Sequence, residues 1–92
     1  IQHMMWARQR PDGGRGFGFT GGHVHWNWAH PDHRRLVVNA IAWIAKLDVP
    51  KGGVTMKDVT LEDLQKNHDE PVSEKFDLTK VTEMVTKFAQ RN

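Results

Sequence analysis

The sequence predicts a mixed α/β fold with a β-hairpin, one long buried helix and an extended tail that carries one or two short helices. Three observations support this prediction. Two short apolar runs flank the turn sequence PDGG, a wide apolar band follows at helical spacing, and the composition becomes polar and glycine-rich after residue 50. We therefore divide the chain into residues 1–50, which hold the hairpin and the helix, and residues 51–92, a linker-like tail with a terminal amphipathic helix.

The hairpin is predicted over residues 2–8 and 15–20. The first run lacks glycine and proline, and in the second Phe17 and Phe19 alternate with glycines, which is the period-two pattern of a strand. The turn sequence between the runs favours an antiparallel pair joined by a loop of several residues. Because the alternating glycines leave one face without side chains, we expect backbone or a ligand to pack closely there.

The long helix is predicted to begin at Pro31 and to end before Pro50. Proline suits the first helical position, Asp32 complements the helix dipole, and His30 would be the N-cap, where Ser, Thr, Asp or Asn is more usual. Its apolar band is too wide for a surface helix and indicates burial against a sheet, with Trp43 in the core. The band consists of Leu36, Val37, Ala40, Ile41, Trp43, Ile44 and Leu47.

The tail holds two further helix candidates. Residues 60–68 are predicted to form a short helix, with Thr60 as the N-cap and an acidic residue three positions later. Residues 78–90 carry apolar side chains at helical spacing, and Asp77 or Thr79 would cap this helix. A helix of this length is marginal alone, so we expect it to dock on a larger body.

Composition limits the classes of function. With 92 residues the chain forms one domain at most, and without cysteine it has no disulfide, no thiolate zinc site and no cysteine nucleophile. No run is long and apolar enough to span a membrane, and the first residues lack the pattern of a signal peptide. The 13 basic and 11 acidic residues nearly balance, so we expect neither nucleic acid nor a membrane as a partner. The cellular compartment stays open.

Two glycine-rich motifs need separate treatment. Residues 16–21 satisfy the G-x-G-x-x-G pattern, but a dinucleotide fingerprint requires these glycines to follow a strand and open a helix, whereas here they lie inside the strand. Residues 15–19, RGFGF, match the start of the RNP1 motif, whose aromatic rings stack on RNA bases. Thr20 and Gly22 break that pattern. RNA binding is a disfavoured alternative, and it predicts that the two phenylalanines lie exposed on an open sheet face.

The histidine-rich loop is the main candidate site. Two of the four tryptophans and four of the six histidines fall between His23 and His33. If the segment is extended, His23 and His25 point to the same side, and a third histidine, His30 or His33, with Asp32 as an oxygen donor, could complete a site for zinc or a similar divalent ion. At a helix N-terminus His30 is favoured as a neutral imidazole, which suits a ligand or a base. The alternative is that these histidines only pack the loop.

The two tryptophans of this loop, Trp26 and Trp28, also have two interpretations. An exposed indole beside polar groups suits the apolar face of a sugar ring. Tryptophan is equally common as a buried side chain whose N–H is satisfied.

The stretch from Gly16 to Pro50 resembles the C-terminal end of the bacterial ThuA-like, or trehalose-utilisation, family. The matching features are a glycine-led strand that runs into Gly22-His23, an aromatic loop, His30-Pro31-Asp32, and the helix Leu36-Val37-Val38-Asn39-Ala40-Ile41-Ala42-Trp43 with its sequel Ala45 to Val54. The resemblance implies a C-terminal fragment of a flavodoxin-like fold, related to class I glutamine amidotransferases but generally without their cysteine. Most of the sheet would lie in a missing N-terminal part of the domain.

The resemblance also suggests function and site residues. It implies a protein of disaccharide metabolism, which when intact processes or binds a small carbohydrate of the trehalose type. His23 matches the Gly-His position and, with His30, is a candidate catalytic residue. Trp26 and His25 lie in a stretch that varies within the family, so their roles rest on the chemistry of the loop: Trp26 and His25 are candidate ligand-binding residues, and His23 and His25 candidate metal ligands. The competing hypothesis is a non-catalytic interaction or oligomerisation module. We expect the isolated chain to be poorly stable or to self-associate.

Overall fold

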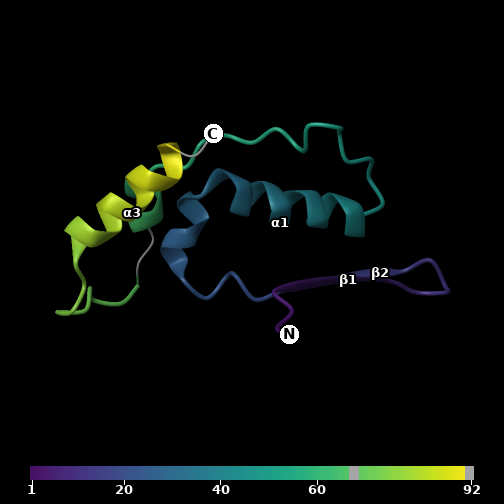
Figure 1. The fold of residues 1–92 in the computed structure, drawn as a ribbon, viewed down its shortest axis with the longest axis horizontal. Coiled ribbons are helices and arrows are strands. Elements are labelled where there is room, and N and C mark those ends of the chain that lie inside the picture. Colours follow the sequence, from purple (N-terminus) through teal and green to yellow (C-terminus); the bar gives the residue numbers. More distant parts are fainter. Residues whose placement is uncertain (67–68, 91–92) are drawn as a thin grey trace.

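The computed structural model describes residues 1–66 and 69–90 and has a small antiparallel sheet with three α-helices, so the predicted mixed α/β class is confirmed. Strands β1 (Met5–Gln9) and β2 (Arg15–Phe19) form the hairpin. A 3-10 helix, η1 (His25–Ala29), then leads directly into the long helix α1 (Pro31–Ile44). The tail carries α2 (Leu61–Gln65) and α3 (Leu78–Gln90), as Figure 1 shows.

The hairpin forms where the sequence predicted it. Its register pairs Met5 with Phe19 and Gln9 with Arg15. The turn is closed by two backbone hydrogen bonds between Arg10 and the two glycines that follow Asp12, and Gly13 has a φ of +88°, which glycine adopts without strain. One glycine of β2 has the expected close neighbour, because a Cβ at Gly18 would overlap the Trp6 ring. At Gly16 the face is open.

The start of α1 also follows the prediction, and the helix ends before Pro50 but earlier than its apolar band suggested. Pro31 occupies the first helical position, and Nδ1 of His30 accepts a hydrogen bond from the Asp32 N–H at 3.1 Å. The helix ends at Ile44, three residues before the end of the apolar band. There Lys46 has a φ of +61°, and the Leu47 N–H donates to the Ala42 carbonyl at 3.0 Å. This Schellman-type end places a lysine where glycine is usual.

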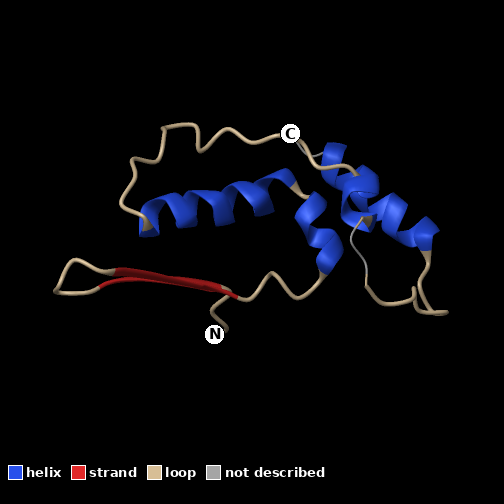
Figure 2. Ribbon diagram, turned by 180° about the vertical axis from the view of Figure 1, so that it is seen from behind, coloured by secondary structure: helices blue, strands red, loops and turns tan. Residues whose placement is uncertain are grey.

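Two segments flank α1. The hairpin runs along one side of the helix and residues 51–59 run along the other, as both ribbon views show (Figures 1 and 2). Nη1 of Arg15 donates to the Trp43 carbonyl at 2.8 Å, and the guanidinium lies 4.9 Å from the centre of the Trp43 ring. On the other side, the Val54 N–H donates to the Asn39 side-chain oxygen at 2.9 Å.

The prediction that α1 is buried is wrong for this chain. None of its residues, all of which the structure describes, is buried, and Trp43 is only half-buried. Ile41 is 60% exposed and Leu47, just beyond the helix, is 64% exposed. The reason is the size of the sheet, since two strands cover only one side of a helix whose apolar band is wide. The radius of gyration is 15.9 Å, against about 12 Å for a compact domain of this length.

The tail helices form as predicted, with a difference in length. Thr60 and Asp63 make a reciprocal capping box at the start of α2, and Asp77 accepts a hydrogen bond from the Lys80 N–H at the start of α3. Helix α2 is shorter than the predicted 60–68, and the last two of those residues lie outside the described part of the chain. Both helices have their main contacts with η1.

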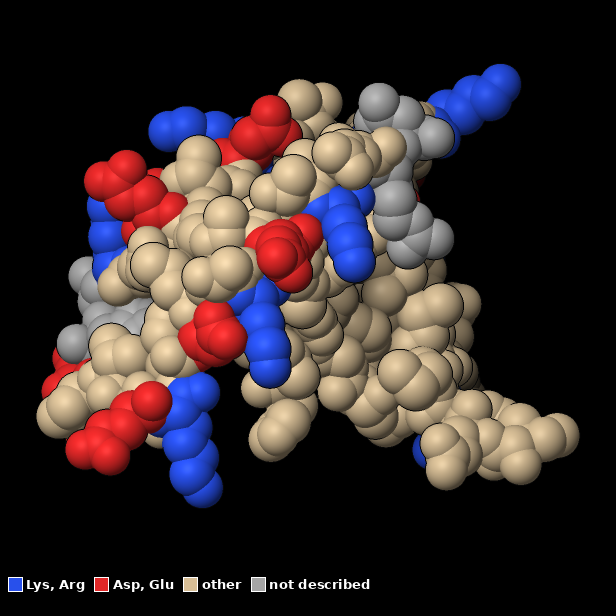
Figure 3. Space-filling view, turned by 60° about the vertical axis from the view of Figure 1, so that its left-hand side comes forward, with Lys and Arg blue, Asp and Glu red and all other residues tan. Residues whose placement is uncertain are grey.

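Three further observations bear on RNA binding, on the distribution of charge and on membrane spanning. Ring contacts join Phe19 to Phe17, with 6.3 Å between centres, and to His33 of α1, with 5.0 Å, so Phe19 does not lie on the open sheet face that an RNP1-type site needs. Acidic and basic side chains are intermixed on the face that includes α3 (Figure 3). In the described residues no helix has the length and apolar character needed to cross a membrane.

Candidate functional site

The histidine and tryptophan loop folds into a turn and the helix η1, which lies at the centre of the contacts between helices. Residues 20–24 form a turn, and His25 already begins η1, so the segment is not the extended strand that would align His23 with His25. Helix η1 contacts all three α-helices. Side chains predicted to form one site therefore project from a tight helical turn toward different neighbours.

His23 and His25 have different environments. His23 is exposed in the turn and forms no hydrogen bond or ion pair with the described residues. Nε2 of His25 donates to the Leu64 carbonyl at 2.7 Å, which ties η1 to α2, and its ring meets the Trp26 ring edge-on with 5.0 Å between centres. In residues 1–66 and 69–90 no three His, Cys, Asp or Glu side chains form a group that could hold a metal ion. The zinc hypothesis thus has no donor set within this part of the chain.

His30 and His33 line a shallow cavity of about 390 Å³. Its other lining residues are Asn27, Asp32, Leu36 and Phe88. The His30 ring lies 4.9 Å from the Phe88 ring of α3, while its Nδ1 caps α1. His33 meets the Phe19 ring at 5.0 Å and the Trp28 ring at 4.6 Å, and its Nε2 is buried without a hydrogen-bond partner among the described residues. Burial, and to a lesser degree the nearby His30, lowers the pKa of His33 below its ordinary value of 6.5.

Arg34 fixes the orientation of η1, a role that the sequence did not suggest. Its Nη1 donates to the carbonyls of Trp28 and Ala29, each at 2.8 Å, which satisfies the free carbonyls at the end of η1. Its Nη2 lies 3.9 Å from a carboxylate oxygen of Asp58, so the same side chain also contacts the tail. The side chain is only 11% exposed, which indicates a structural arginine rather than a ligand-binding one.

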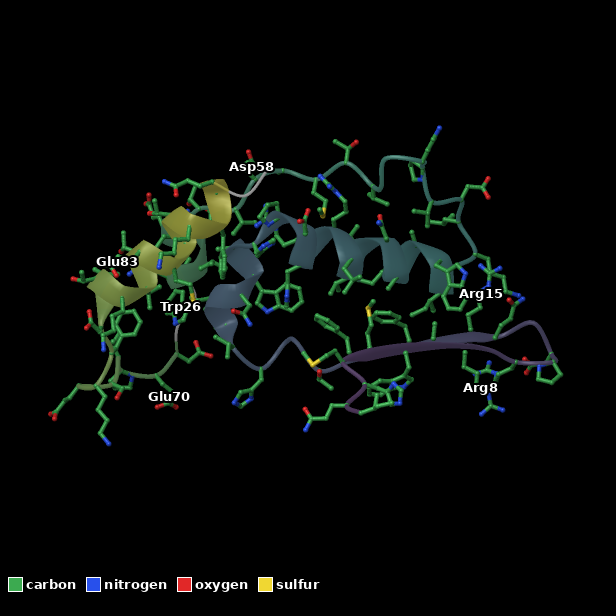
Figure 4. All side chains as sticks on the ribbon, in the orientation of Figure 1. Arg8, Arg15, Trp26, Asp58, Glu70 and Glu83 are labelled. Carbon is green, nitrogen blue, oxygen red and sulfur yellow. The ribbon has the colours of Figure 1, made fainter. Side chains whose placement is uncertain are left out.

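A groove lies between η1 and the segment before α3, and we call it the Trp26 groove. Its volume is about 590 Å³. The Trp26 and Phe76 rings line it with their centres 5.3 Å apart and their planes tilted by 35°. In Figure 4, Trp26 lies on the side of η1 that faces α3 and the loop that carries Glu70. The remaining lining residues are Gln65, Asp69, Glu70, Pro71, Val72 and Ser73.

The structure separates the four residues predicted as site residues. Trp26 lines the large groove, His30 lines the smaller cavity, His25 holds η1 against α2, and His23 is exposed in the turn. The sequence did not identify Phe76 as a partner of Trp26. The only hint was a lone aromatic residue in the polar stretch DEPVSEKFD, because the contact depends on how the tail folds back on η1.

Comparisons of the chain with protein-family models, with curated proteins and with solved structures gave no match.

Proposed function

We propose that this chain is the C-terminal part of a ThuA-like protein of carbohydrate metabolism, and that it binds a sugar in the Trp26 groove. The observation that carries the proposal is the pairing of Trp26 and Phe76, whose rings meet at 5.3 Å in an open groove that has polar groups along its edges.

The chemistry of this groove suits a sugar. The C–H face of a pyranose ring packs on an aromatic ring, while its hydroxyls need hydrogen-bond donors and acceptors around the edge. The Gln65 amide, the Ser73 hydroxyl and the carboxylates of Asp69 and Glu70 supply both kinds of group. A volume of about 590 Å³ is within the usual range for small-molecule sites and has room for a disaccharide.

The ThuA-like part of the proposal is supported by the uncovered surface of α1. The resemblance implies a larger flavodoxin-like sheet, and a helix from such a fold would expose its apolar band once that sheet is removed. Ile41, Ile44 and Leu47 are exposed in this way. In the intact domain, His23, exposed before η1, would face groups from the rest of the domain and act as a catalytic group or a zinc ligand, and His30 would be the second catalytic candidate.

Titration of the chain with trehalose and glucose, followed by NMR chemical shifts, tests sugar binding. We expect shifts at Trp26 and Phe76 and a large loss of affinity in Trp26→Ala and in Phe76→Ala. Trp6→Ala is the matched control, since it removes a tryptophan that is 56% exposed on β1. Circular dichroism of each variant checks that the helices remain. If no sugar binds, or if Trp26→Ala binds as well as the wild type, the proposed site is wrong.

A second candidate function, an interaction module, is favoured by the same exposed residues of α1. In that case the apolar surface would be covered by the rest of a larger protein, and the chain would bind no sugar. The two candidates differ in sugar binding: Trp26→Ala abolishes it if the groove is a sugar site, whereas an interaction module binds no sugar in the wild type either.

A further inference from the structure

The outer edge of β1 carries backbone groups that have no partner strand. The sheet has the order β1-β2, and in the described part of the chain no other strand pairs with either of them. The Met4 carbonyl accepts a hydrogen bond from the residue after β2, at 3.0 Å, and the Arg10 N–H donates to the residue before β2, at 2.7 Å. Because bonded and non-bonded positions alternate along an antiparallel pair, the residues whose N–H and C=O groups point away from β2 are Met5, Ala7 and Gln9. Such an edge is a template for another strand.

The side chains of the hairpin alternate between two faces. Phe19 and Arg15 contact α1, so the residues of β1 opposite them share the face that looks toward the helix. Trp6 and Arg8 lie on the other face, since a Cβ at Gly18 would overlap the Trp6 ring and Figure 4 shows Arg8 on the side of the hairpin away from α1. Trp6 is 56% exposed, and the exposed Arg8 side chain forms no hydrogen bond or ion pair with the described residues.

We propose that β1 pairs with β1 of a second copy of the chain, antiparallel and centred on Ala7, so that two hairpins form one continuous sheet. With this centre, Ala7 lies opposite Ala7 of the second copy and Met5 lies opposite its Gln9, and each such pair exchanges both backbone hydrogen bonds. Trp6 then lies directly opposite Arg8 of the second copy, on the same face and at the closer spacing of a non-bonded pair. One contact between a guanidinium and an indole ring therefore forms on each side of the axis.

The side chains of β1 select Ala7 as the centre. A centre at Gln9 would place Arg8 opposite Arg10 of the second copy, and like charges directly opposite each other destabilise a sheet. A centre at Met5 would pair β1 with residues 1–5, most of which precede the strand. Because the axis through Ala7 is perpendicular to the sheet, the α1 helices of both copies lie on one face of it, and the exposed apolar residues of α1 and the edge of β1 serve the same dimer.

Single cysteines test the register, because the chain has no cysteine of its own. The Cα atoms of a hydrogen-bonded antiparallel pair are about 5.5 Å apart, which a disulfide can span, so Ala7→Cys should give a covalent dimer on mild oxidation. Gln9→Cys is the matched control on the same edge and face, since about 13 Å of strand separates it from Gln9 of the second copy, and it should not cross-link alone. A mixture of Met5→Cys and Gln9→Cys should cross-link.

Ala7→Pro tests the backbone hydrogen bonds. The Ala7 N–H takes no part in the pairing with β2, so proline removes a donor only from the dimer and is tolerated at a strand edge. Sedimentation velocity should show dimerisation about tenfold weaker or less in Ala7→Pro, and unchanged dimerisation in Ala7→Ser, which keeps the N–H. Circular dichroism and NMR chemical shifts of β2 check that the hairpin remains.

Arg8→Gln tests the side-chain contacts without changing the backbone. It removes the guanidinium on both sides of the axis and should weaken dimerisation by about 5- to 30-fold. Lys80→Gln is the control, because it removes the same charge from an exposed position on α3, at the other end of the molecule, and should have no effect.

Three results would overturn the inference. The first is a wild-type chain that sediments as a monomer at every concentration up to the millimolar range, which would leave the edge to a strand of another protein. The second is cross-linking of Gln9→Cys as readily as of Ala7→Cys, which would exclude the register. The third is a dimer that Arg8→Gln and Ala7→Pro both form as tightly as the wild type, which would place the contact away from β1.

Discussion

The exposed apolar surface of α1 predicts weak self-association of the chain, and its strength follows from the exposed fractions. Ile41, Ile44 and Leu47 are 60%, 39% and 64% exposed. Fully burying one such side chain stabilises a protein by about 1.5–3 kcal/mol, so covering the exposed parts of all three is worth about 2.5–5 kcal/mol per chain. A symmetric pair of chains gains about twice as much, and association itself costs about 4–15 kcal/mol. The gain from burial and the cost of association nearly cancel, so we expect dissociation constants of about 10 μM or weaker.

The substitution Ile41→Lys tests this estimate. It removes the more exposed isoleucine of α1 and introduces a charge that a dimer would have to bury twice. The loss of burial alone amounts to about 2–4 kcal/mol per dimer, at least a thirtyfold weaker association. Sedimentation velocity over a wide concentration range measures it, with Gln90→Lys at the end of α3 as a control of equal charge.

Two results would refute this reasoning. A nanomolar wild-type dimer would mean that the surfaces in contact are much larger than these three residues. Unchanged association of Ile41→Lys would place the contact elsewhere on the chain, for example on the exposed Met4, Met5 and Trp6 of the hairpin end.

The remaining predictions concern stability. Because burial lowers the pKa of His33 below 6.5, the unfolded chain binds this proton at a higher pH than the folded chain does. The free energy of unfolding should therefore be highest above about pH 6.5 and fall as the pH drops from there through the folded-state pKa. Urea denaturation at several pH values measures this dependence, which should be weaker in His33→Gln. Arg15→Met removes the hydrogen bond to the Trp43 carbonyl and the ring contact, and should cost about 2–3 kcal/mol in the same assay, with exposed Arg8→Met neutral. Lys46→Gly relieves a φ of +61° and should raise stability by about 1 kcal/mol, while Lys46→Ala should bring no gain.

The elements that the sequence predicted well depend on local chemistry. The hairpin follows from Pro11, Asp12 and Gly13, whose backbone preferences fix the turn wherever the rest of the chain lies. The start of α1 follows from His30-Pro31-Asp32 and the start of α2 from Thr60 and its acidic partner, because capping needs only neighbours within one turn.

The features that the sequence did not predict depend on distant residues. The periodicity of the apolar band predicts that α1 packs against other residues, but it cannot say whether those residues lie within the same chain, and in the described residues Ile41 stays 60% exposed. The band also extends past Ile44, and the positive φ of Lys46 ends the helix without the glycine that would have marked it. The Trp26 groove needs Phe76, which reaches Trp26 only because the tail folds back on η1.

The concentration of histidines and tryptophans around η1 has a structural cause that complements the proposed site. A chain with only Ala29 and Leu64 buried among its described residues cannot hold its hairpin and its helices together with an aliphatic core. Rings with a polar edge can do so at half-exposed positions, because they pack through a face and donate or accept a hydrogen bond through a nitrogen at the edge. His25 joins η1 to α2 through the Leu64 carbonyl, and His33 joins α1 to both β2 and η1. Their effect is to hold η1 so that the Trp26 ring faces Phe76, which makes the groove depend on histidines that do not line it.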